Sequence, residues 1–559
     1  MFREAQRYIS EGWGRAVQET ANAVHLIKQR GPSQIQFWVI ALLIGSAAGA
    51  VAIGFRVAIS TLQQFFYGAD DAMLASHAAN LPWFRVLIIP VIGGLVVGAI
   101  LHFFIKDKRT RSVAHVIEGA ALRNGRVEKR AGLASALMSL ITLSTGGSTG
   151  REGPVVHLGA VISSWVSNMI NANGITGRDL LGCAAAAAVS ASFNAPIAGA
   201  LFALEVVLRH FAVHAFAPIV IASVAGTVVS RIQMGNVTEF VLPAHTLGFY
   251  VELPAFMILG LLCGLVAAMI MRAIFIAEDI GDAVQCAAGI PDWLRPACAG
   301  LLLGLLAIAF PHIIGVGYET TSNALSGNLL LWEAVVFAII KAIAVAITIA
   351  GRMGGGVFSP ALMLGALTGL AFGLISTEIF PSVSGTVGLY AFAGMGAVAA
   401  AVLGAPISTT LIVFELTGDW QAGIAVMVSV SLSSALASRL VDRSFFLSQI
   451  ERRGVHIAAG PQAYLQGVIY VSDVMRPINA EQTAEAEQLD LLIEQGAMLL
   501  KRDTLEKALP LFEQTETDYL PVISLRENEA PKVLGTVFYI DALKAFNRAL
   551  TETAREEHS

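Results

Sequence analysis

The chain has 559 residues, of which 55% are hydrophobic and 14% are charged, and its formal net charge is -5. Because a soluble domain carries about 25% charged residues, this composition excludes a disordered chain, a nucleic-acid-binding protein and a secreted disulfide scaffold. It predicts a protein that crosses the lipid bilayer several times and carries a smaller attached domain.

Residues 1–30 carry charges of both signs and no early apolar run. The charged residues are Arg3, Glu4, Arg7, Glu11, Arg15, Glu19, Lys28 and Arg30. A secretory signal peptide needs an apolar stretch in this region. We therefore expect residues 1–34 to form a cytoplasmic amphipathic helix at the membrane surface.

Residues 35–455 consist of apolar segments separated by glycine, proline and short polar runs. Several segments have about 20 residues, the length that crosses the hydrocarbon core of a bilayer. Others are shorter and bounded by glycine or proline, which is typical of broken helices that line a cavity inside a membrane protein. The predicted fold is therefore an all-α polytopic membrane domain.

This region contains an internal repeat. Pro154-Val-Val-His-Leu-Gly-Ala160 matches Pro360-Ala-Leu-Met-Leu-Gly-Ala366 at an offset of 206 residues. Ala195-Pro-Ile197 followed by Glu205 matches Ala405-Pro-Ile407 followed by Glu415 at an offset of 210 residues. Corresponding glycine- and proline-interrupted segments in two halves indicate where a transporter-like fold binds its substrate.

Two glycine-rich loops each precede a proline that suits the first turn of a helix. They are Ser144-Thr-Gly-Gly-Ser-Thr-Gly-Arg-Glu-Gly-Pro154 and Gly354-Gly-Gly-Val-Phe-Ser-Pro360. Such a loop aims unpaired backbone N–H groups and the positive end of the helix dipole at one point, which favours an anion. We predict that the two loops converge on one anion.

Glu152 lies inside the first loop. A carboxylate within a membrane costs about 2.5–3.5 kcal/mol on insertion scales and is a functional candidate by default. One hypothesis is that this carboxylate occupies the anion site and leaves when it is protonated or displaced, so that Glu152 is a gate. The alternative is that Glu152 pairs with Arg151 and only fixes the loop.

Several other charged residues lie in apolar sequence. Glu205 and Glu415 occupy equivalent repeat positions, which favours a structural role in bracing helix ends over a role in proton movement. Lys341 and Arg352 either add positive potential for anions or extend to an interface.

The four cysteines, Cys183, Cys263, Cys286 and Cys298, form no CxxC pair. With no His/Cys cluster at metal-ligand spacing, we predict four core thiols, no metal and no cofactor. No catalytic constellation is present either, so we expect no enzyme.

The last part of the chain has a different composition. Residues 471–559 contain 17 Asp and Glu against 9 Lys and Arg, whereas the rest of the chain is slightly basic. A helical pattern at 503–514 and a short strand at 520–523 predict a small soluble α/β domain within residues 456–559. The preceding arginines favour a cytoplasmic location for it.

In combination, the motifs Gly150-Arg-Glu-Gly-Pro154, Phe193-Asn-Ala-Pro-Ile-Ala-Gly199, Gly356-Val-Phe-Ser-Pro360 and Phe414-Glu-Leu-Thr-Gly418 resemble the CLC family of chloride channels and proton-coupled chloride exchangers. The resemblance covers residues 35–455. It implies a homodimer in which each subunit has two inverted repeats of tilted helices and its own pore for chloride or a similar monovalent anion. Pro154 favours chloride over fluoride.

The resemblance also implies site residues. Glu152 would be the gating glutamate, and the backbone amides of Val357 and Phe358 would bind the central chloride. The anion-binding set predicted from the two loops is Gly150, Arg151, Gly153, Gly356, Val357 and Phe358.

Three departures from the family pattern bear on the mechanism. The first family signature is degenerate here, so that either Arg111 or Ser112 takes the position of the family's central serine. Phe446 takes the position of its central tyrosine and has no hydroxyl. Val206 stands where many exchangers carry a proton-transferring glutamate, which leaves Glu152 and Glu205 as proton-path candidates.

Val471-Ser-Asp-Val-Met-Arg-Pro477 and Gly535-Thr-Val-Phe-Tyr-Ile-Asp541 resemble the beginning and the end of a CBS repeat. The resemblance makes Asp541 a candidate for holding the ribose of an adenine nucleotide. Phe538 replaces the hydroxyl residue of nucleotide-binding repeats, which favours a packing role.

Taken together, these features predict passive or weakly proton-coupled chloride conduction gated by Glu152. The alternatives are a coupled chloride/proton antiporter with a non-standard proton path and a membrane sensor that transports nothing. By analogy with bacterial family members, we expect an inner (plasma) membrane location with both termini cytoplasmic.

Overall fold

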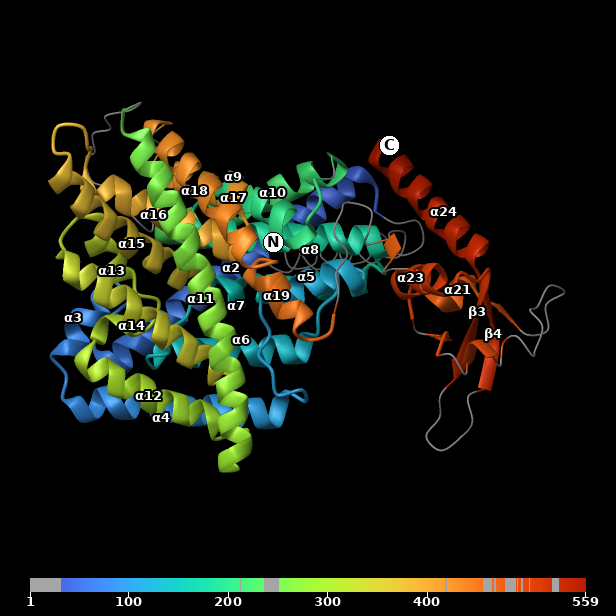
Figure 1. The fold of residues 1–559 in the computed structure, drawn as a ribbon, viewed down its shortest axis with the longest axis horizontal. Coiled ribbons are helices and arrows are strands. Elements are labelled where there is room, and N and C mark those ends of the chain that lie inside the picture. The colour runs from blue at the N-terminus through green and yellow to red at the C-terminus, as the bar shows by residue number, and fades with distance from the viewer. Residues whose placement is uncertain are drawn as a thin grey trace, which may run out of the picture.

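A computed structural model of the chain describes residues 32–211, 213–235, 251–417, 420–455, 465–466, 469–477, 489, 491–493, 496–501, 503–524 and 532–558. Its largest part is a body of helices that cross one another at varied angles, and a smaller unit with a four-stranded sheet lies beside this body (Figure 1). The predicted N-terminal amphipathic helix lies almost entirely outside the described residues.

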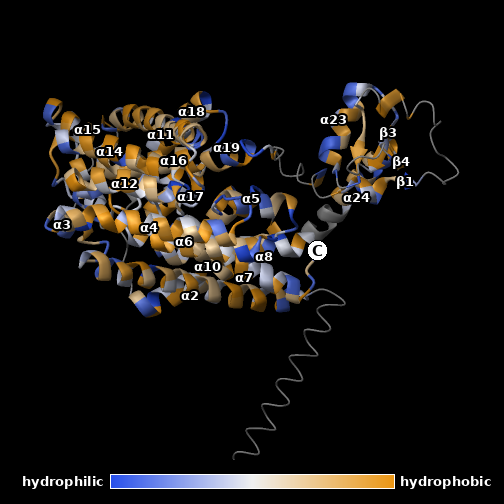
Figure 2. Ribbon diagram, turned by 90° about the horizontal axis from the view of Figure 1, so that it is seen from below, coloured by the Kyte–Doolittle hydropathy of each residue, from blue (hydrophilic) through white to orange (hydrophobic). Residues whose placement is uncertain are grey.

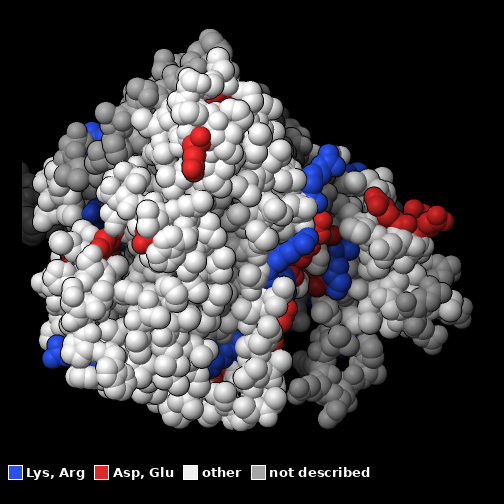
Figure 3. Space-filling view, turned by 60° about the vertical axis from the view of Figure 1, so that its left-hand side comes forward, with Lys and Arg blue, Asp and Glu red and all other residues white. Residues whose placement is uncertain are grey.

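Seven helical segments among the described residues are long and apolar enough to cross a membrane. They are α2 (Gln34–Tyr67), α4 (Trp83–Phe104), α10 (Val213–Met234), α11 (Leu253–Ala288), α14 (Leu331–Ala350), α15 (Phe358–Ile379) and the pair α18 (Trp420–Leu440) and α19 (Phe445–Glu451). Hydrophobic residues predominate along these helices (Figure 2). On the face in Figure 3, the described charged side chains gather mainly in a band along one edge, which leaves a broad uncharged surface for lipid.

The other helices of the body include several that are too short to span a bilayer, as predicted. The helices are α3 (Leu74–Ala79), α5 (Val113–Leu122), α6 (Lys129–Ser144), α7 (Glu152–Met169), α8 (Gly174–Phe193), α9 (Pro196–Phe202), α12 (Arg295–Ala309), α13 (Tyr318–Leu325), α16 (Val387–Leu403) and α17 (Pro406–Thr417). A π-helical turn at Ala203–Leu208 continues α9, and a 3₁₀ turn at Pro311–Ile313 follows α12.

Small residues allow the central helices to approach closely. The alanine run at 184–188 of α8 is fully buried. Where α15 crosses α16, a side chain at Gly365 would overlap the carbonyl oxygen of Gly394. Burying an apolar side chain against a neighbouring helix gains little over leaving it in lipid. Close backbone packing of this kind is therefore what holds such helices together in a membrane.

Two reciprocal contacts relate the repeats. Glu205 accepts hydrogen bonds from the backbone N–H groups of Ile407 (2.9 Å) and Ser408 (2.7 Å) at the start of α17. Glu415 accepts equivalent bonds from Ile197 (3.0 Å) and Ala198 (2.8 Å) at the start of α9. Each glutamate therefore caps the helix of the other repeat, which confirms the structural role predicted for this pair.

The structure decides two predictions about individual side chains, those of the four cysteines and of Lys341. Cys183 and Cys263 are buried, but Cys286 and Cys298 are exposed, so the prediction of four core thiols was wrong for two of them. The reason is that an apolar stretch of a helix has outward-facing positions as well as core positions, and the sequence alone does not tell them apart. Lys341 is fully buried and donates hydrogen bonds to the carbonyl oxygens of Ile313 (3.2 Å) and Gly315 (3.0 Å), so it braces a loop rather than reaching an interface.

The C-terminal unit is a small α/β domain with its own core, as predicted. Its sheet has the order β1-β4-β3-β2, with β2 parallel to β3 and the other pairs antiparallel. The strands are β1 (Arg476–Pro477), β2 (Leu499–Leu500), β3 (Tyr519–Ser524) and β4 (Lys532–Phe538), and the helices are α21 (Val471–Val474), α23 (Leu505–Thr515) and α24 (Tyr539–His558). The likeness to a CBS repeat and the boundary at residue 456 stay predictions.

The reciprocal caps lead to a first test. Glu205→Ala and Glu415→Ala should each lower the melting temperature of the purified protein, because each removes the acceptor of two backbone N–H groups, a loss of roughly 1–3 kcal/mol. Thermal unfolding in detergent measures the effect. The matched control is Glu378→Ala, which truncates an exposed carboxylate near the end of α15. Equal melting temperatures for all variants would contradict the capping role.

Candidate functional site

The two glycine-rich loops meet at the centre of the helical body. The N–H of Gly150 donates to the carbonyl oxygen of Gly356 at 2.7 Å, and the N–H of Gly356 donates back to Gly150 at 2.8 Å. Thr149 adds a hydroxyl hydrogen bond to the same Gly356 oxygen at 2.7 Å. Gly355 has a φ of 142°, which only glycine adopts without strain. These contacts place the starts of α7 and α15 side by side, as the sequence predicts.

Glu152 is the first residue of α7, and its side chain is 2% exposed. Ser359 in the first turn of α15 donates its hydroxyl hydrogen to Glu152 Oε1 at 2.6 Å. The Tyr318 hydroxyl, from α13, lies 3.4 Å from the same oxygen. The carboxylate therefore reaches from one helix start to the other, where the positive ends of two helix dipoles favour negative charge.

Gly150 leaves the room that this carboxylate occupies. A Cβ atom at Gly150 would lie 2.7 Å from Glu152 Oε2 and 3.0 Å from the backbone nitrogen of Ser359. The carboxylate and an early backbone nitrogen of α15 thus face the same small space. A backbone that a ligand approaches this closely is a usual reason for glycine.

Arg151 contacts the ring of Tyr318, the residue whose hydroxyl lies near Glu152. Its guanidinium lies over the ring of Tyr318, 4.9 Å from the ring centroid. This cation–π contact fixes Tyr318 below the loop, since such contacts stabilise most where water is excluded. Arg151 thereby supports the position of Tyr318 beside Glu152.

A cavity of about 320 Å³ extends from Glu152 to a charged mouth. Its inner walls are apolar and include Val113, Val156, Val189, Phe202, Ile349, Phe358, Phe445 and Phe446. The mouth, which we name the arginine vestibule, contains Arg109, Arg295, Arg352, Arg452 and Arg453 together with Glu278 and Asp282. Four of these arginines are ion-paired, Arg295 and Arg352 with Asp282, Arg452 with Asp279 and Arg453 with Glu118, so the mouth offers guanidinium N–H donors whose charge is largely balanced.

The structure brings most of the predicted site residues to this cavity. Glu152, Gly153, Gly356, Val357, Phe358, Phe446 and Ser112 line it, whereas Gly150, Arg151, Glu205 and Arg111 are not among the lining residues. Of the two candidates for the degenerate first signature, the geometry thus favours Ser112 over Arg111.

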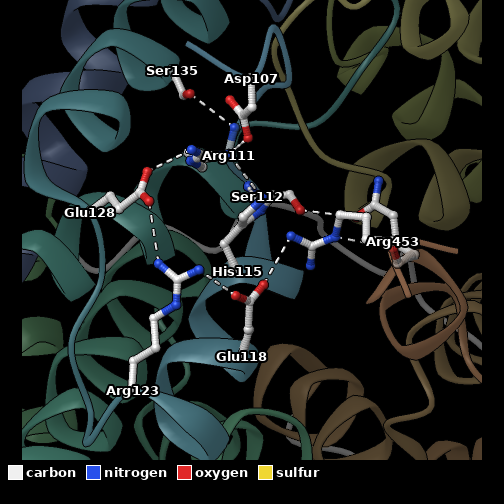
Figure 4. A network of polar contacts seen from close by, with 10 residues as sticks. Asp107, Arg111, Ser112, His115, Glu118, Arg123, Glu128, Ser135 and Arg453 are labelled. Atoms are coloured by element: carbon white, nitrogen blue, oxygen red, sulfur yellow. Dashed lines mark hydrogen bonds and ion pairs between the residues drawn. The ribbon is translucent and has the colours of Figure 1, made fainter. Parts of the chain in front are cut away.

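Arg111 belongs to an ion-pair network beside the cavity (Figure 4). Its guanidinium lies 2.6 Å from both Asp107 and Glu128, and its backbone N–H donates to Ser135. Partial burial alone raises the pKa of Glu128, but the hydrogen bonds and charges of Arg111 and Arg123 outweigh it, so this pKa is lowered. Arg111 therefore pairs with carboxylates and is not among the residues that line the cavity.

The remainder of the network joins α5 to the end of α19. Glu118 of α5 pairs with Arg123 at 2.7 Å and with Arg453 at 2.9 Å (Figure 4). Ser112, directly before α5, donates its hydroxyl hydrogen to Gln449 Oε1 of α19 at 3.0 Å. Two separate contacts thus hold α19, which carries Phe446, against α5.

Sequence reasoning missed Ser359, Tyr318, Gln449 and most of the arginine vestibule. Ser359 had a usable signal, because it precedes Pro360 in the second glycine-rich motif. Tyr318 and Gln449 come from segments outside every motif. Only the fold shows that they approach Glu152 and Ser112.

Comparison with known proteins gives the family of this chain. Residues 93–438 match the family model for the voltage gated chloride channel. The chain belongs to this family. It is 31% identical over 395 residues to a putative ClcB-like chloride channel protein of Ralstonia nicotianae, an alignment that covers 70% of this chain and 91% of that protein.

Solved structures show the same fold. A slow cyanobacterial Cl⁻/H⁺ antiporter superposes with a TM-score of 0.67 at 21% identity, covering 76% of this chain and 98% of the other. A eukaryotic CLC transporter superposes with a TM-score of 0.66 at 18% identity, covering 93% and 98%. The family and the apolar helices make this chain a multi-pass integral membrane protein whose function class is chloride transport.

The contacts of Glu152 lead to a second test. Ser359→Ala removes a hydrogen-bond donor that lies 2.6 Å from the carboxylate, so Glu152 should leave its position more readily and, if this carboxylate blocks the cavity, chloride efflux from liposomes should rise. A hydrogen bond to a charged group contributes about 1.5–3 kcal/mol, so the rise should be roughly tenfold or more if the gate limits the rate. The matched control is Ser431→Ala, at an exposed serine of α18. Wild-type efflux in Ser359→Ala would show that this hydrogen bond does not hold the gate.

Proposed function

We propose that chloride passes through the cavity between the arginine vestibule and the paired helix starts, and that the Glu152 carboxylate is its gate. The observation that carries this proposal is the position of Glu152, which is buried at the meeting point of α7 and α15 and faces the cavity. A monovalent anion and a carboxylate compete for the same positive environment there. Either protonation of Glu152 or a high chloride concentration would then open the path.

We further propose that conduction is passive or only weakly coupled to protons. Glu205, the remaining proton-path candidate, already accepts two backbone hydrogen bonds at the start of α17. Protonating it would weaken a helix cap, because a neutral carboxyl accepts such bonds less strongly than a carboxylate. The neighbouring position carries Val206, which cannot transfer a proton.

A coupled chloride/proton antiporter is the second candidate. Two observations favour it: Glu152 is a buried titratable group that lines the cavity, and a solved structure of similar fold is a Cl⁻/H⁺ antiporter. A proton would then have to leave Glu152 by a route that uses neither Glu205 nor Val206. The third hypothesis, a membrane sensor without transport, predicts no chloride flux at all.

The assembly and location follow the family expectations. We propose a homodimer in which each subunit has its own path, in the inner (plasma) membrane of a bacterium, with both termini cytoplasmic. The support is the broad uncharged surface of the helical body, which suits both lipid and a second subunit (Figure 3).

A liposome experiment tests the gate and the coupling together. Chloride efflux of the wild-type protein should rise as pH falls, because protonation removes the charge that holds Glu152 between the helix starts. Glu152→Gln, which resembles the protonated form, should show fast efflux that no longer depends on pH. Chloride and external pH are recorded at the same time, and Glu378→Gln is the matched control at an exposed glutamate.

The outcomes separate the three hypotheses. Chloride efflux without linked proton movement supports passive or weakly coupled conduction. Proton uptake at a fixed ratio to chloride, abolished in Glu152→Gln, would establish the antiporter instead. If the wild-type protein carries no chloride flux, the hypothesis that remains is the membrane sensor without transport.

The C-terminal domain is proposed to pack and stabilise rather than to bind a nucleotide. Asp541 Oδ2 accepts a hydrogen bond from Arg476 Nε at 2.7 Å, and the Arg476 guanidinium lies 4.4 Å from the ring centroid of Phe538. The carboxylate that would hold a ribose is therefore already engaged by an arginine of the same domain.

ATP and AMP are expected to leave the melting temperature of the full-length protein unchanged. The ion pair between Arg476 and Asp541 would have to open before the carboxylate met a ribose. Thermal unfolding with and without each nucleotide checks this. A rise in melting temperature that disappears in Asp541→Asn would show that Asp541 binds nucleotide after all.

A further inference from the structure

Helix α19 presents two residues to the cavity, one apolar and one polar. Phe446 and Gln449 are three residues apart, so they share one face of the helix, and both line the cavity. Phe446 is 4% exposed and offers no hydrogen-bond donor to an anion. Gln449 carries an amide with two N–H donors and one acceptor oxygen.

The hydrogen bond between Ser112 and Gln449 determines which donor remains for an anion. Ser112 has a single hydroxyl hydrogen, and it donates this hydrogen to Gln449 Oε1 at 3.0 Å. In that arrangement the Ser112 hydroxyl cannot also donate to chloride. The donors that the pair has left are the two N–H groups on Gln449 Nε2. If the amide turns by half a rotation, Nε2 donates to Ser112 and frees the hydroxyl hydrogen, so the pair still offers a donor.

The end of α19 is fixed so that this amide stays in place. Arg453 pairs with Glu118 of α5 at 2.9 Å, and its Nε donates to the backbone oxygen of Gln449 at 3.3 Å. Glu118 is itself held by Arg123 (Figure 4). The side chain of Gln449 is thereby held by Ser112 at the start of α5. Its backbone oxygen is held by Arg453, which pairs with Glu118 near the middle of α5. A donor positioned before the ligand arrives loses little entropy on binding it.

We propose that Gln449 is an anion-coordinating residue, whose side-chain amide binds chloride on its way from the arginine vestibule to Glu152, and that Ser112 orients this amide. The inference deepens the proposed function and rests on it. An amide is a neutral donor, so it binds a monovalent anion without adding a fixed charge that would trap it. Phe446 supplies the apolar wall beside this donor.

The test measures chloride efflux from liposomes over a range of chloride concentrations for the full-length protein. Gln449→Met keeps the length of the side chain and removes both N–H donors. It should raise the chloride concentration that gives half-maximal efflux by roughly tenfold or more, as expected for losing a hydrogen bond to a charged group. Ser112→Ala should give a smaller shift in the same direction, because the amide stays but is no longer oriented. The matched control is Gln64→Met, at an exposed glutamine at the end of α2.

An unchanged half-saturating concentration in Gln449→Met, with normal efflux, would overturn the role of Gln449 and leave the proposed function intact. No efflux in the wild-type protein would instead refute the proposed function. If Gln449→Met transports nothing, isothermal titration of chloride into the detergent-solubilised variant decides. Weakened chloride binding would support the inference, and wild-type binding would contradict it.

Discussion

The pair of backbone hydrogen bonds between Gly150 and Gly356 is the contact on which the rest of the site depends. It joins the loops before α7 and α15, so the positive ends of two helices meet. A single helix start is a weak anion site, whereas two starts at one point add their fields and their N–H groups. Glycine suits the first of these positions because a side chain at Gly150 would intrude on Glu152 and on the backbone of Ser359.

The distribution of charge follows from this centre. Charged groups gather at the cavity mouth, where arginines pair with carboxylates, while Asp107 and Glu128 hold Arg111 outside the cavity lining. Burying an unpaired charge in a membrane costs several kcal/mol, which agrees with the ion pairs that Arg295, Arg352, Arg452 and Arg453 form at this mouth. On the proposed path, a chloride ion would meet the arginine vestibule at the entrance, apolar walls beyond it, and the Glu152 carboxylate at the far end.

The repeats, the converging loops and Glu152 could be predicted from the sequence, because glycine and proline at fixed spacing leave few backbone alternatives. The caps formed by Glu205 and Glu415 were predictable for the same reason, since equivalent residues in a symmetric fold make equivalent contacts. Tyr318 and Gln449 could not be predicted, because each lies on a helix far along the chain and reaches the site only through tertiary packing. The exposure of Cys286 and Cys298 was missed because hydropathy does not distinguish a lipid-facing position from a core position.

The same symmetry shows why only one repeat carries the carboxylate of the proposed gate. At the repeat offset of 206 residues, Gly150 corresponds to Gly356, Glu152 to Phe358 and Gly153 to Ser359. The two backbone hydrogen bonds between Gly150 and Gly356 are reciprocal, but the side chains at the corresponding positions of the two repeats differ. Phe358 packs its ring against Phe193 with centroids 4.8 Å apart, and Ser359 donates to Glu152. One repeat thus supplies the carboxylate and the other supplies the hydroxyl that donates to it, so a symmetric backbone carries an asymmetric pair of side chains at the site of the proposed gate.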